Sequence, residues 1–378
     1  MNFKKQRILI CRSNPIVPDP RVEKTVKSLA EAGYNVAILC WDRTGRLPVG
    51  EVVNGVPCTR LPIKAQYGSG MENFLPLFRW QWMLFRWLII HKNDYDLIHA
   101  CDFDTVLAGM IVKRLFGKKV IYDIFDFYAD HLRATPNWTK NIIRAVDLWV
   151  INHVDGLIVT DDARWEQISI EAPKNSAVIY NTPQDTSDLF GKQDQPSPSR
   201  GLQLVYVGLL QVERGLLDIL SILNENPNWH LDLAGFGGDE ELILEKAGKM
   251  ENVQWHGRIP YQRALELTHG ADVILALYDP ALPNHRYASP NKLFEAMMLG
   301  KPIVVAAKTN IDSIVLDENC GLVIEYGGIT ELRDSLLRLD ADLMLRRKLG
   351  ANGRRAYETK YSWVEMKKRL LDLYGHMG

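Results

Sequence analysis

Residues 289–302 read SPNKLFEAMMLGKP and carry the signals of one complete short helix. Ser289 is a favoured N-cap residue, and Pro290 would follow at the first helical position, where its missing N–H costs nothing. Gly300 stands where a left-handed C-cap is expected, and the proline two residues later prevents the helix from continuing. Because the apolar run 303–306 follows directly, the stretch is one helix–strand step of an α/β fold.

The same alternation of short apolar runs and amphipathic helices extends along the whole chain. The predicted strands of the first half are residues 7–11, 35–39, 59–63, 96–100, 119–123, 156–160 and 177–180. Those of the second half are residues 202–207, 231–234, 253–256, 272–277, 303–306 and 322–325. Continuous apolar strands of this kind belong to parallel sheets that helices cover on both faces. We therefore predict an α/β protein with two doubly wound, Rossmann-like domains and a cleft between the carboxyl ends of their strands.

Length and composition agree with a division into two domains. The chain has 378 residues, which is more than one hydrophobic core usually holds together. Residues 184–201 are polar, with proline, serine and glycine, and are typical of an interdomain linker. We place the N-terminal domain at residues 1–184 and the C-terminal domain at residues 201–359.

Charge and cysteine usage exclude several classes of protein. The formal net charge of −1 gives no overall attraction for nucleic acid. The five cysteines are scattered without a C-x-x-C pair, which argues against a zinc site or a disulfide scaffold and fits a reducing cytoplasm. The short apolar run after the basic N-terminus is better explained as a first strand than as a signal peptide. We expect a cytoplasmic protein.

The start of the 289–302 helix is a predicted phosphate site. Its free backbone N–H groups and positive dipole end would be joined by the amide of Asn291 and the ammonium group of Lys292. Glu295 lies four residues after Asn291 on the same helical face, where a carboxylate can accept hydrogen bonds from a ribose diol. By themselves, these residues fit an ordinary α/β helix with a partly exposed glutamate equally well.

Glycine and arginine residues follow the predicted strands of the second half. Gly208 would let a ligand approach a strand end closely, and Arg214 would open the next helix on the side of the cleft. Gly237 belongs to a glycine turn after the following strand, and Arg258 to the turn after the third. Each arginine has the alternative of being a solvated surface cation.

Residues 290–305, PNKLFEAMMLGKPIVV, resemble the nucleotide-sugar-binding segment of the family 4 retaining glycosyltransferases, which have the GT-B fold. The resemblance covers nearly the whole chain and is clearest from Val205 to Tyr374. It implies that a sugar, typically a hexose, moves from a nucleoside-diphosphate sugar to a hydroxyl of a glycan or lipid-linked glycan. It also implies that neither a metal nor another cofactor takes part, and that the last helix, about residues 360–378, packs back on the first domain.

The resemblance gives roles to the residues of the second half. Arg214 and Lys292 would neutralise the diphosphate and Glu295 would bind the ribose. The other implied donor contacts are Gly208, Gly237, Arg258, Tyr287 and Asn291. The sequence departs from the family pattern at four positions, where Leu209 replaces an arginine, Arg214 a lysine, Tyr287 a glutamate and Phe125 a histidine. Arg214 keeps a cation at its position, and the cation at the position of Leu209 is lost. The phenol of Tyr287 can hydrogen-bond a sugar hydroxyl but cannot place a carboxylate beside the anomeric carbon.

In the first half, the resemblance points to the acceptor side. Asp126 matches the acidic position of a Y-D-x-H-E segment and would orient sugar hydroxyls, with a helix cap as the alternative. His131 is a nearby substitute for the missing histidine. Asp19 and Arg21 would line the acceptor side, although Asp19 is also a good N-cap residue. The D-x-D at residues 102–104 is expected to cap a helix that starts near Thr105 rather than to bind a metal.

Residues 74–90 combine tryptophan, phenylalanine and arginine in one helical stretch that is too short and too charged to span a bilayer. One interpretation is a helix packed on the sheet with its aromatic side chains in the core. The other is a peripheral membrane contact, with tryptophans at headgroup depth and arginines near lipid phosphates. The second interpretation would place the protein at the inner face of the cell membrane.

The predicted function is that of a retaining, metal-independent glycosyltransferase, in the synthesis of a cell-surface polysaccharide or a lipid-linked oligosaccharide. Two alternatives keep the same fold and donor site. One is a nucleotide-sugar epimerase. The other is a nucleotide-sugar-binding protein without catalysis, which the missing glutamate and histidine would fit.

Overall fold

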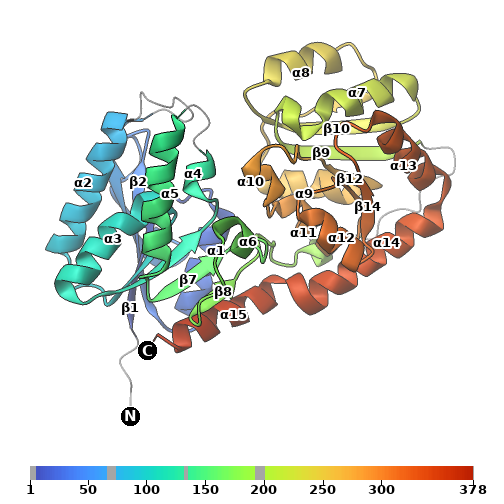
Figure 1. Cartoon of the computed structure of the whole chain (residues 1–378). Coiled ribbons are helices and arrows are strands. Elements are labelled where there is room, and N and C mark those ends of the chain that lie inside the picture. Colours follow the sequence, from blue (N-terminus) through green and yellow to red (C-terminus); the bar gives the residue numbers. More distant parts are fainter. Residues whose placement is uncertain (1–5, 66–73, 132–134, 192–200, 378) are drawn as a thin grey trace. The chain divides into compact units, whose positions relative to one another are not determined.

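The computed structural model describes residues 6–65, 74–131, 135–191 and 201–377, and it contains two compact units (Figure 1). Unit 1 consists of Met1–Tyr180 and Met366–Gly378, and unit 2 of Asn181–Glu365. Each unit has its own sheet and its own hydrophobic core. Both are α/β, as the sequence predicted. The side chain of His131 and residues 192–200 of the expected linker lie outside the described residues.

Unit 2 is built on six parallel strands in the order β11-β10-β9-β12-β13-β14. The strands are β9 (Gln203–Leu209), β10 (His230–Phe236), β11 (Val253–Trp255), β12 (Val273–Ala276), β13 (Ile303–Ala306) and β14 (Gly321–Ile324). Counted along the chain, this order is third, second, first, fourth, fifth and sixth. It therefore reverses between β9 and β12, and such a switch point is where open α/β sheets bind ligands.

Helices cover both faces of this sheet. They are α7 (Leu216–Glu225), α8 (Glu240–Ala247), α9 (Tyr261–Gly270), α10 (Pro283–Arg286), α11 (Asn291–Met298), α12 (Ile311–Asp317), α13 (Ile329–Ala341) and α14 (Leu343–Ala356). The apolar runs predicted as strands form the buried centre, for example Leu204, Leu231 and Leu275. Side chains of successive strand residues point to opposite faces, so a strand covered on both sides has to be apolar throughout.

Unit 1 has eight strands in the order β3-β4-β2-β1-β5-β6-β7-β8. They are β1 (Arg7–Arg12), β2 (Asn35–Asp42), β3 (Gly50–Val53), β4 (Val56–Pro62), β5 (Leu97–Cys101), β6 (Lys119–Ile124), β7 (Gly156–Val159) and β8 (Ser176–Val178). β3 pairs antiparallel with β4, which corrects the expectation of a purely parallel sheet. Asn54 and Gly55 join the two strands with φ of 51° and 79°, a pair of left-handed residues that favours a tight hairpin.

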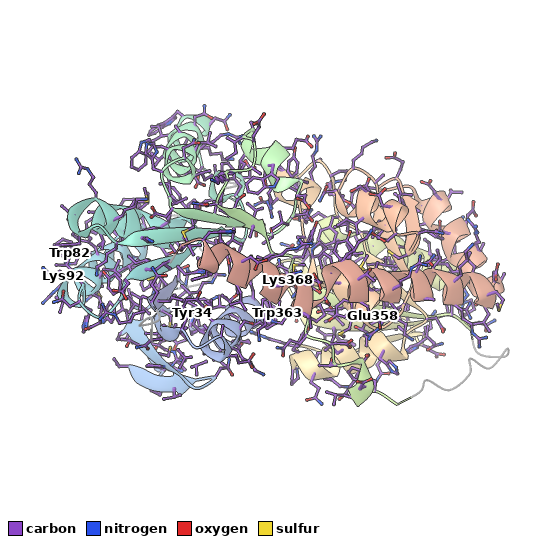
Figure 2. All side chains as sticks on the ribbon, turned by 90° about the horizontal axis from the view of Figure 1, so that it is seen from below. Tyr34, Trp82, Lys92, Glu358, Trp363 and Lys368 are labelled. Atoms are coloured by element: carbon purple, nitrogen blue, oxygen red, sulfur yellow. The ribbon has the colours of Figure 1, made fainter. Side chains whose placement is uncertain are left out.

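The helices of unit 1 are α1 (Pro20–Glu31), α2 (Phe74–Ile90), α3 (Phe103–Phe116), α4 (Tyr128–His131), α5 (Asn137–Ile151), α6 (Arg164–Ile168) and, from Met366 onward, α15 (Trp363–Gly375). On the sheet, the indole of Trp41 stacks on that of Trp80 with 5.3 Å between ring centroids. At the other end of the chain, the Tyr374 hydroxyl lies 2.6 Å from His99 Nδ1. The ring of Tyr374 also lies 5.7 Å from that of Tyr34, which Figure 2 labels beside α15.

Candidate functional site

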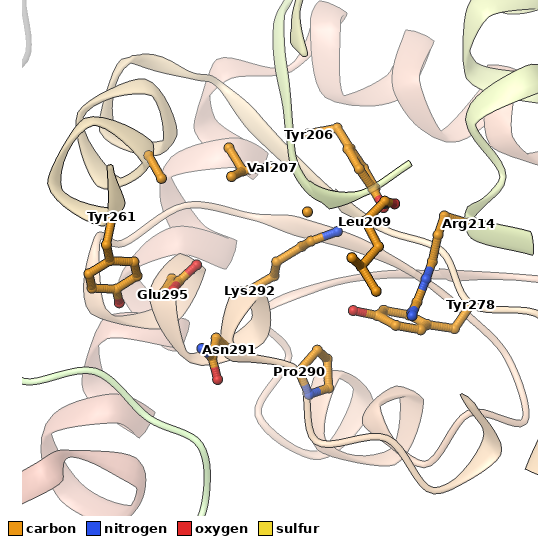
Figure 3. A pocket seen from close by; sticks show the side chains of 12 residues that line it. Tyr206, Val207, Leu209, Arg214, Tyr261, Tyr278, Pro290, Asn291, Lys292 and Glu295 are labelled. Carbon is orange, nitrogen blue, oxygen red and sulfur yellow. The ribbon is translucent and has the colours of Figure 1, made fainter. Parts of the chain in front are cut away.

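A cavity of about 330 Å³ opens at the carboxyl end of β9 in unit 2 (Figure 3). It lies at the point where the strand order reverses, since its walls come from the end of β9, the residues after β12 and the starts of α9 and α11. Its lining residues are Tyr206, Val207, Gly208, Leu209, Arg214, Tyr261, Ala264, Tyr278, Pro290, Asn291, Lys292 and Glu295. The structure thus brings together five of the predicted site residues, Gly208, Arg214, Asn291, Lys292 and Glu295.

The ends of α11 differ in part from the prediction. Pro290 is the N-cap, with φ −75° and ψ 139°, and no side chain caps the helix. The prediction that Ser289 is the N-cap is therefore wrong. Ser289 lies one position before the N-cap, and its buried Oγ has no hydrogen-bond partner among the described residues. At the other end, Gly300 has φ 64°, and Lys301 N–H donates to the Ala296 carbonyl at 2.8 Å. This is the predicted left-handed glycine ending, in Schellman form.

Glu295 is held in the cavity wall by the apolar face of its own helix. Its neighbours Phe294, Ala296 and Met297 are buried in unit 2, and this fixes the direction in which the Glu295 side chain can leave the helix. Figure 3 shows its carboxylate next to the phenol of Tyr261. Burial and the neighbouring Glu295 together raise the pKa of Tyr261, so the phenol stays protonated and can donate to the carboxylate.

The side chain of Lys292 extends across the cavity toward Leu209 and Tyr206 (Figure 3). Its ammonium nitrogen lies 3.6 Å from the centre of the Tyr206 ring. A Cβ on Gly208 would be 3.1 Å from Lys292 Cε, so only glycine leaves this path open. Burial, and next the charge of Arg214, hold the pKa of Lys292 well below its usual range. A bound anion next to this nitrogen would raise the pKa of Lys292 and favour the charged ammonium form.

Arg214 ends a short 3-10 turn, Val212–Arg214, directly after β9. Its guanidinium lies 4.2 Å above the ring of Tyr278, which comes two residues after β12. Its Nε is buried and has no hydrogen-bond partner among the described residues. A partly exposed guanidinium with an unused buried donor can bind an anion, and a phosphate oxygen fits this requirement.

Two family models match the chain. The Glycosyl transferase 4-like domain matches residues 18–172, and the Glycosyl transferases group 1 domain matches residues 190–356. The chain belongs to the GT-B glycosyltransferases. Its two-domain α/β fold with parallel sheets is the GT-B fold.

Relatives and solved structures agree with this assignment. The glycosyltransferase is 23% identical over 297 residues to phosphatidyl-myo-inositol mannosyltransferase of Mycobacterium leprae, a match that spans 76% of this chain and 75% of the relative. Further curated relatives are matched over 45% of their own length or less. Sucrose-phosphate synthase of Thermosynechococcus elongatus shares the fold with a TM-score of 0.79 and 18% identity, over 99% of both chains. Anabaena HepE in complex with UDP-glucose has a TM-score of 0.71 and 14% identity, over 98% of this chain and all of the other.

Three further residues of unit 2 that were predicted to contact the donor, Gly237, Arg258 and Tyr287, do not line the cavity. A Cβ on Gly237 would be 2.1 Å from the carbonyl oxygen of Leu210, so this glycine allows two loops to pack together. Arg258 lies over the ring of Phe236, with 4.5 Å from Cζ to the centroid. Tyr287 follows α10 as its C-cap.

In unit 1, the predicted residue Asp19 is the N-cap of α1, as its alternative interpretation expected. Its Oδ1 accepts from Val22 N–H at 3.3 Å, and its Oδ2 forms an ion pair with Arg12 at 3.0 Å. Arg21 is the second residue of this helix, is buried, and donates to both carboxylate oxygens of Asp123, at 2.7 and 3.2 Å. The Arg21 side chain is therefore part of the buried interior of unit 1.

Asp126 follows β6, where the sequence predicted an acidic residue at a strand end. Its Oδ1 accepts from Arg164 Nη2 at 2.7 Å, and about half of its side chain is exposed. Phe125 next to it lies between two guanidinium groups, 4.1 Å from that of Arg12 and 4.9 Å from that of Arg21. The carboxylate of Asp126 thus has a fixed orientation and one open side.

Asp102 is the N-cap residue of α3, so the D-x-D segment does stand at a helix start as predicted, but its side chain does not make the cap. The helix α3 begins at Phe103, and the Asp102 side chain makes no capping hydrogen bond. Its carboxylate instead accepts from Phe125 N–H at 2.9 Å and pairs with Arg12. Asp102 also has φ 65° and ψ 167°, a strained conformation for a residue other than glycine. Burial raises its pKa to about 6.

A buried group of potential metal ligands lies on β5 and β6 of unit 1. The ligand atoms of His99, Cys101 and Asp123 lie within 4.8 Å of one another. The Asp123 carboxylate is already engaged by Arg21, and His99 Nδ1 by the hydroxyl of Tyr374. His99, whose Nε2 lies 3.4 Å from Asp123 Oδ2, therefore forms a hydrogen-bonded link between the sheet and Tyr374 of α15.

Three tyrosines of the cavity, Tyr206, Tyr261 and Tyr278, were not among the residues predicted from the sequence. The prediction rested on glycine and charged residues at strand ends, and aromatic residues there were not considered. Tyr278 directly follows the predicted strand 272–277, so its position at a strand end was an available signal. Tyr206 and Tyr261 gave no such signal, because they reach the cavity only through the pairing of β9 and the packing of α9.

Proposed function

We propose that this glycosyltransferase uses a nucleoside-diphosphate sugar and retains the anomeric configuration. One observation carries the proposal. The guanidinium of Arg214, the ammonium of Lys292 and the start of α11 converge in one cavity at the strand switch point of unit 2, with Glu295 one helical turn away. This combination suits a diphosphate next to a ribose.

In the proposed complex, Arg214 and Lys292 bind the diphosphate, Asn291 and the first N–H groups of α11 bind phosphate oxygens, and Glu295 accepts from the ribose hydroxyls. The low pKa of Lys292 supports this arrangement, since the bound diphosphate would restore its charge. Gly208 lets the donor approach the end of β9. The proposal does not require a metal ion, because two side-chain cations take the charge of the leaving group.

The proposed transfer exchanges one bond at the anomeric carbon for another. The bond from the anomeric carbon to the diphosphate oxygen breaks, and a bond to the acceptor oxygen forms on the same face. The acceptor hydroxyl gives its proton to the departing phosphate. Arg214 and Lys292 would stabilise the charge that develops on this phosphate, and Asp126 would orient the reacting hydroxyls.

For the acceptor, we propose a glycan or a lipid-linked glycan, in polysaccharide or glycolipid synthesis. The name of the Mycobacterium leprae relative identifies a lipid acceptor for that protein. We also propose that the segment Pro290–Glu295 marks a subgroup that does without the usual first glutamate, whose position is held by Tyr287. No further cofactor is needed for this chemistry.

Glu295→Ala and Arg214→Ala test the site. Both variants are expected to abolish most sugar transfer and to keep the melting temperature of the free protein within a few degrees, because both side chains face the cavity. Glu251→Ala and Arg263→Ala remove the same groups from the surface of unit 2 and should leave transfer unchanged. Near-normal turnover in both site variants would refute the proposed donor site.

Labelled nucleotide sugars distinguish this function from its alternatives. Thermal shifts with UDP-, GDP- and ADP-sugars first identify the donor. Release of the nucleotide that depends on acceptor or water indicates a transferase. An isomerised nucleotide sugar would instead indicate an epimerase, and binding without turnover a nucleotide-sugar-binding protein.

A further inference from the structure

Three neighbouring helices of unit 1 expose large apolar side chains. The helix α3 contacts both α2 and α5, and Figure 1 shows these helices next to one another in unit 1. Six residues define the exposed apolar part of this α2–α5 face: Phe74, Phe78, Trp82, Trp138, Ile142 and Trp149. Single exposed apolar residues are normal, but a group of this size on adjacent helices marks an interaction surface.

The helix α2 has two apolar sides with different environments. Trp80, Leu84 and Leu88 are fully buried against the sheet, so one side belongs to the core, as the first interpretation of this segment predicted. On the opposite side, Phe78 is 65% and Trp82 is 58% exposed. Trp82 lies at the outer edge of unit 1 in Figure 2. The core therefore accounts for only half of the aromatic residues in α2.

The helix α5 repeats this pattern. Trp138, Ile142 and Trp149 follow at helical spacings of four and seven residues and form one stripe, with exposures of 68%, 55% and 52%. The buried side of the helix holds Val150 and Ile151. Two separate helices thus expose tryptophan on the side that faces away from the core.

The charges on this face have a single sign. Arg79 and Arg86 on α2 and Arg114 on α3 are exposed. The acidic residues of α2, α3 and α5 in the described chain are Asp104 and Asp147, and both are buried. An occupant of the face would therefore meet exposed arginines without exposed carboxylates on these helices.

We propose that the α2–α5 face docks on a membrane surface that contains anionic lipid. Tryptophan and phenylalanine would enter the headgroup region, while the arginines pair with lipid phosphates. A second copy of the chain fits less well, because a two-fold contact would bring the arginines of both copies together. The docking does not depend on the donor site, so a failure of either proposal leaves the other standing.

Vesicle flotation with the full chain tests the docking. We expect the protein to float with phosphatidylcholine vesicles that contain one quarter phosphatidylglycerol at low salt, and to float much less with pure phosphatidylcholine or at high salt. No flotation with anionic vesicles at low salt would overturn the proposal.

Two pairs of variants, each with a matched control, locate the contact. Phe78→Ser with Trp82→Ser, and Arg79→Glu with Arg86→Glu, should each lower vesicle partitioning by about tenfold or more. Leu316→Ser with Val364→Ser removes equally exposed apolar groups from other helices, and Lys249→Glu with Lys308→Glu reverses equally exposed charges. The controls should bind like the unchanged protein. Equal binding of site and control variants, with far-UV circular dichroism intact, would overturn the assignment of this face.

Fluorescence separates insertion from simple adsorption and from self-association. Lipids with brominated acyl chains should quench part of the tryptophan emission, and Trp82→Phe should lose a measurable share of that quenching. Unquenched emission of vesicle-bound protein would contradict insertion. A dimer in sedimentation that disappears in the Trp82→Ser variant would show that a second copy occupies the face, and would also overturn the proposal.

Discussion

At the scale of single residues, Lys292 has the most unusual environment in the donor cavity. Its ammonium lies over an aromatic ring, and burial together with Arg214 lowers its pKa below the usual 10.5. A bound diphosphate would raise this pKa again, so the protein should take up protons when UDP binds at neutral to alkaline pH, by at most about one proton. Calorimetry in buffers of different ionisation enthalpy measures this uptake.

The Lys292→Met variant should bind UDP more weakly and lose the proton uptake. Lys308→Met serves as the control, because it removes an exposed lysine from the same unit. A binding enthalpy that does not vary with the buffer at any of these pH values would contradict the assignment of Lys292 to the diphosphate.

The second residue-level prediction concerns Asp147 and the way the stability of unit 1 changes with pH. Its Oδ1 accepts from the Tyr122 hydroxyl at 2.9 Å, and burial raises its pKa to about 7. Since an aspartate in an unfolded chain has a pKa of about 3.9, the folded state holds the proton more tightly. The resulting stabilisation is complete below about pH 4 and is lost as the pH rises through about 7.

Asp147→Asn keeps the shape of the side chain without a charge. We expect the free energy of unfolding of unit 1 to be about 2–4 kcal/mol higher in this variant at pH 8, and to fall less between pH 5 and pH 8. Denaturant titrations at several pH values measure this difference. Glu171→Gln, at an exposed site of unit 1, should leave the pH profile unchanged. Parallel profiles for Asp147→Asn and the unchanged protein would contradict a raised pKa.

At the scale of elements, the close contact between the end of β9 and the start of α11 shapes the cavity. Gly208→Ala would place a methyl group 3.1 Å from Lys292 Cε and should displace that side chain. We expect UDP affinity to fall by about tenfold. Stability should fall as well, because Gly208 has φ 156°, a backbone conformation that a residue with a Cβ rarely adopts. Two control variants separate the contact from the backbone strain. Gly238→Ala adds a methyl group that meets nothing within 4 Å, and Gly257→Ala does the same at a positive φ of 70°. Equal UDP affinities for Gly208→Ala and both controls would show that Lys292 does not need this space.

At the scale of the whole molecule, the two units each have their own sheet and core, so they should respond separately to heat and ligand. We expect two calorimetric transitions, of which UDP raises only that of unit 2. Arg214→Ala should remove this shift, while Asp147→Asn should change only the transition of unit 1. A single transition that UDP moves as a whole would show that the units unfold together.

Much of the fold and part of the candidate site could be predicted from local patterns in the sequence. The apolar runs, the glycine ending of α11 and the helical segment 74–90 could all be predicted, because each depends on residues near one another in the chain. Gly208 and Arg214 could be placed near Lys292 for a related reason. The carboxyl ends of parallel strands share one edge of a sheet, so strand-end residues meet there.

Local sequence patterns therefore predicted the alternation of helices and strands, the α/β class and the approximate place of the cavity in unit 2. Tertiary packing alone gives the cations of the cavity their aromatic neighbours Tyr206 and Tyr278. It also pairs Arg21 with Asp123, and it directs the Asp102 carboxylate toward Arg12 rather than toward the N–H groups of α3. Periodicity encodes which side of an element is buried. It does not encode which distant side chain that side will meet, because strand register and helix packing bring those partners together only in the folded chain.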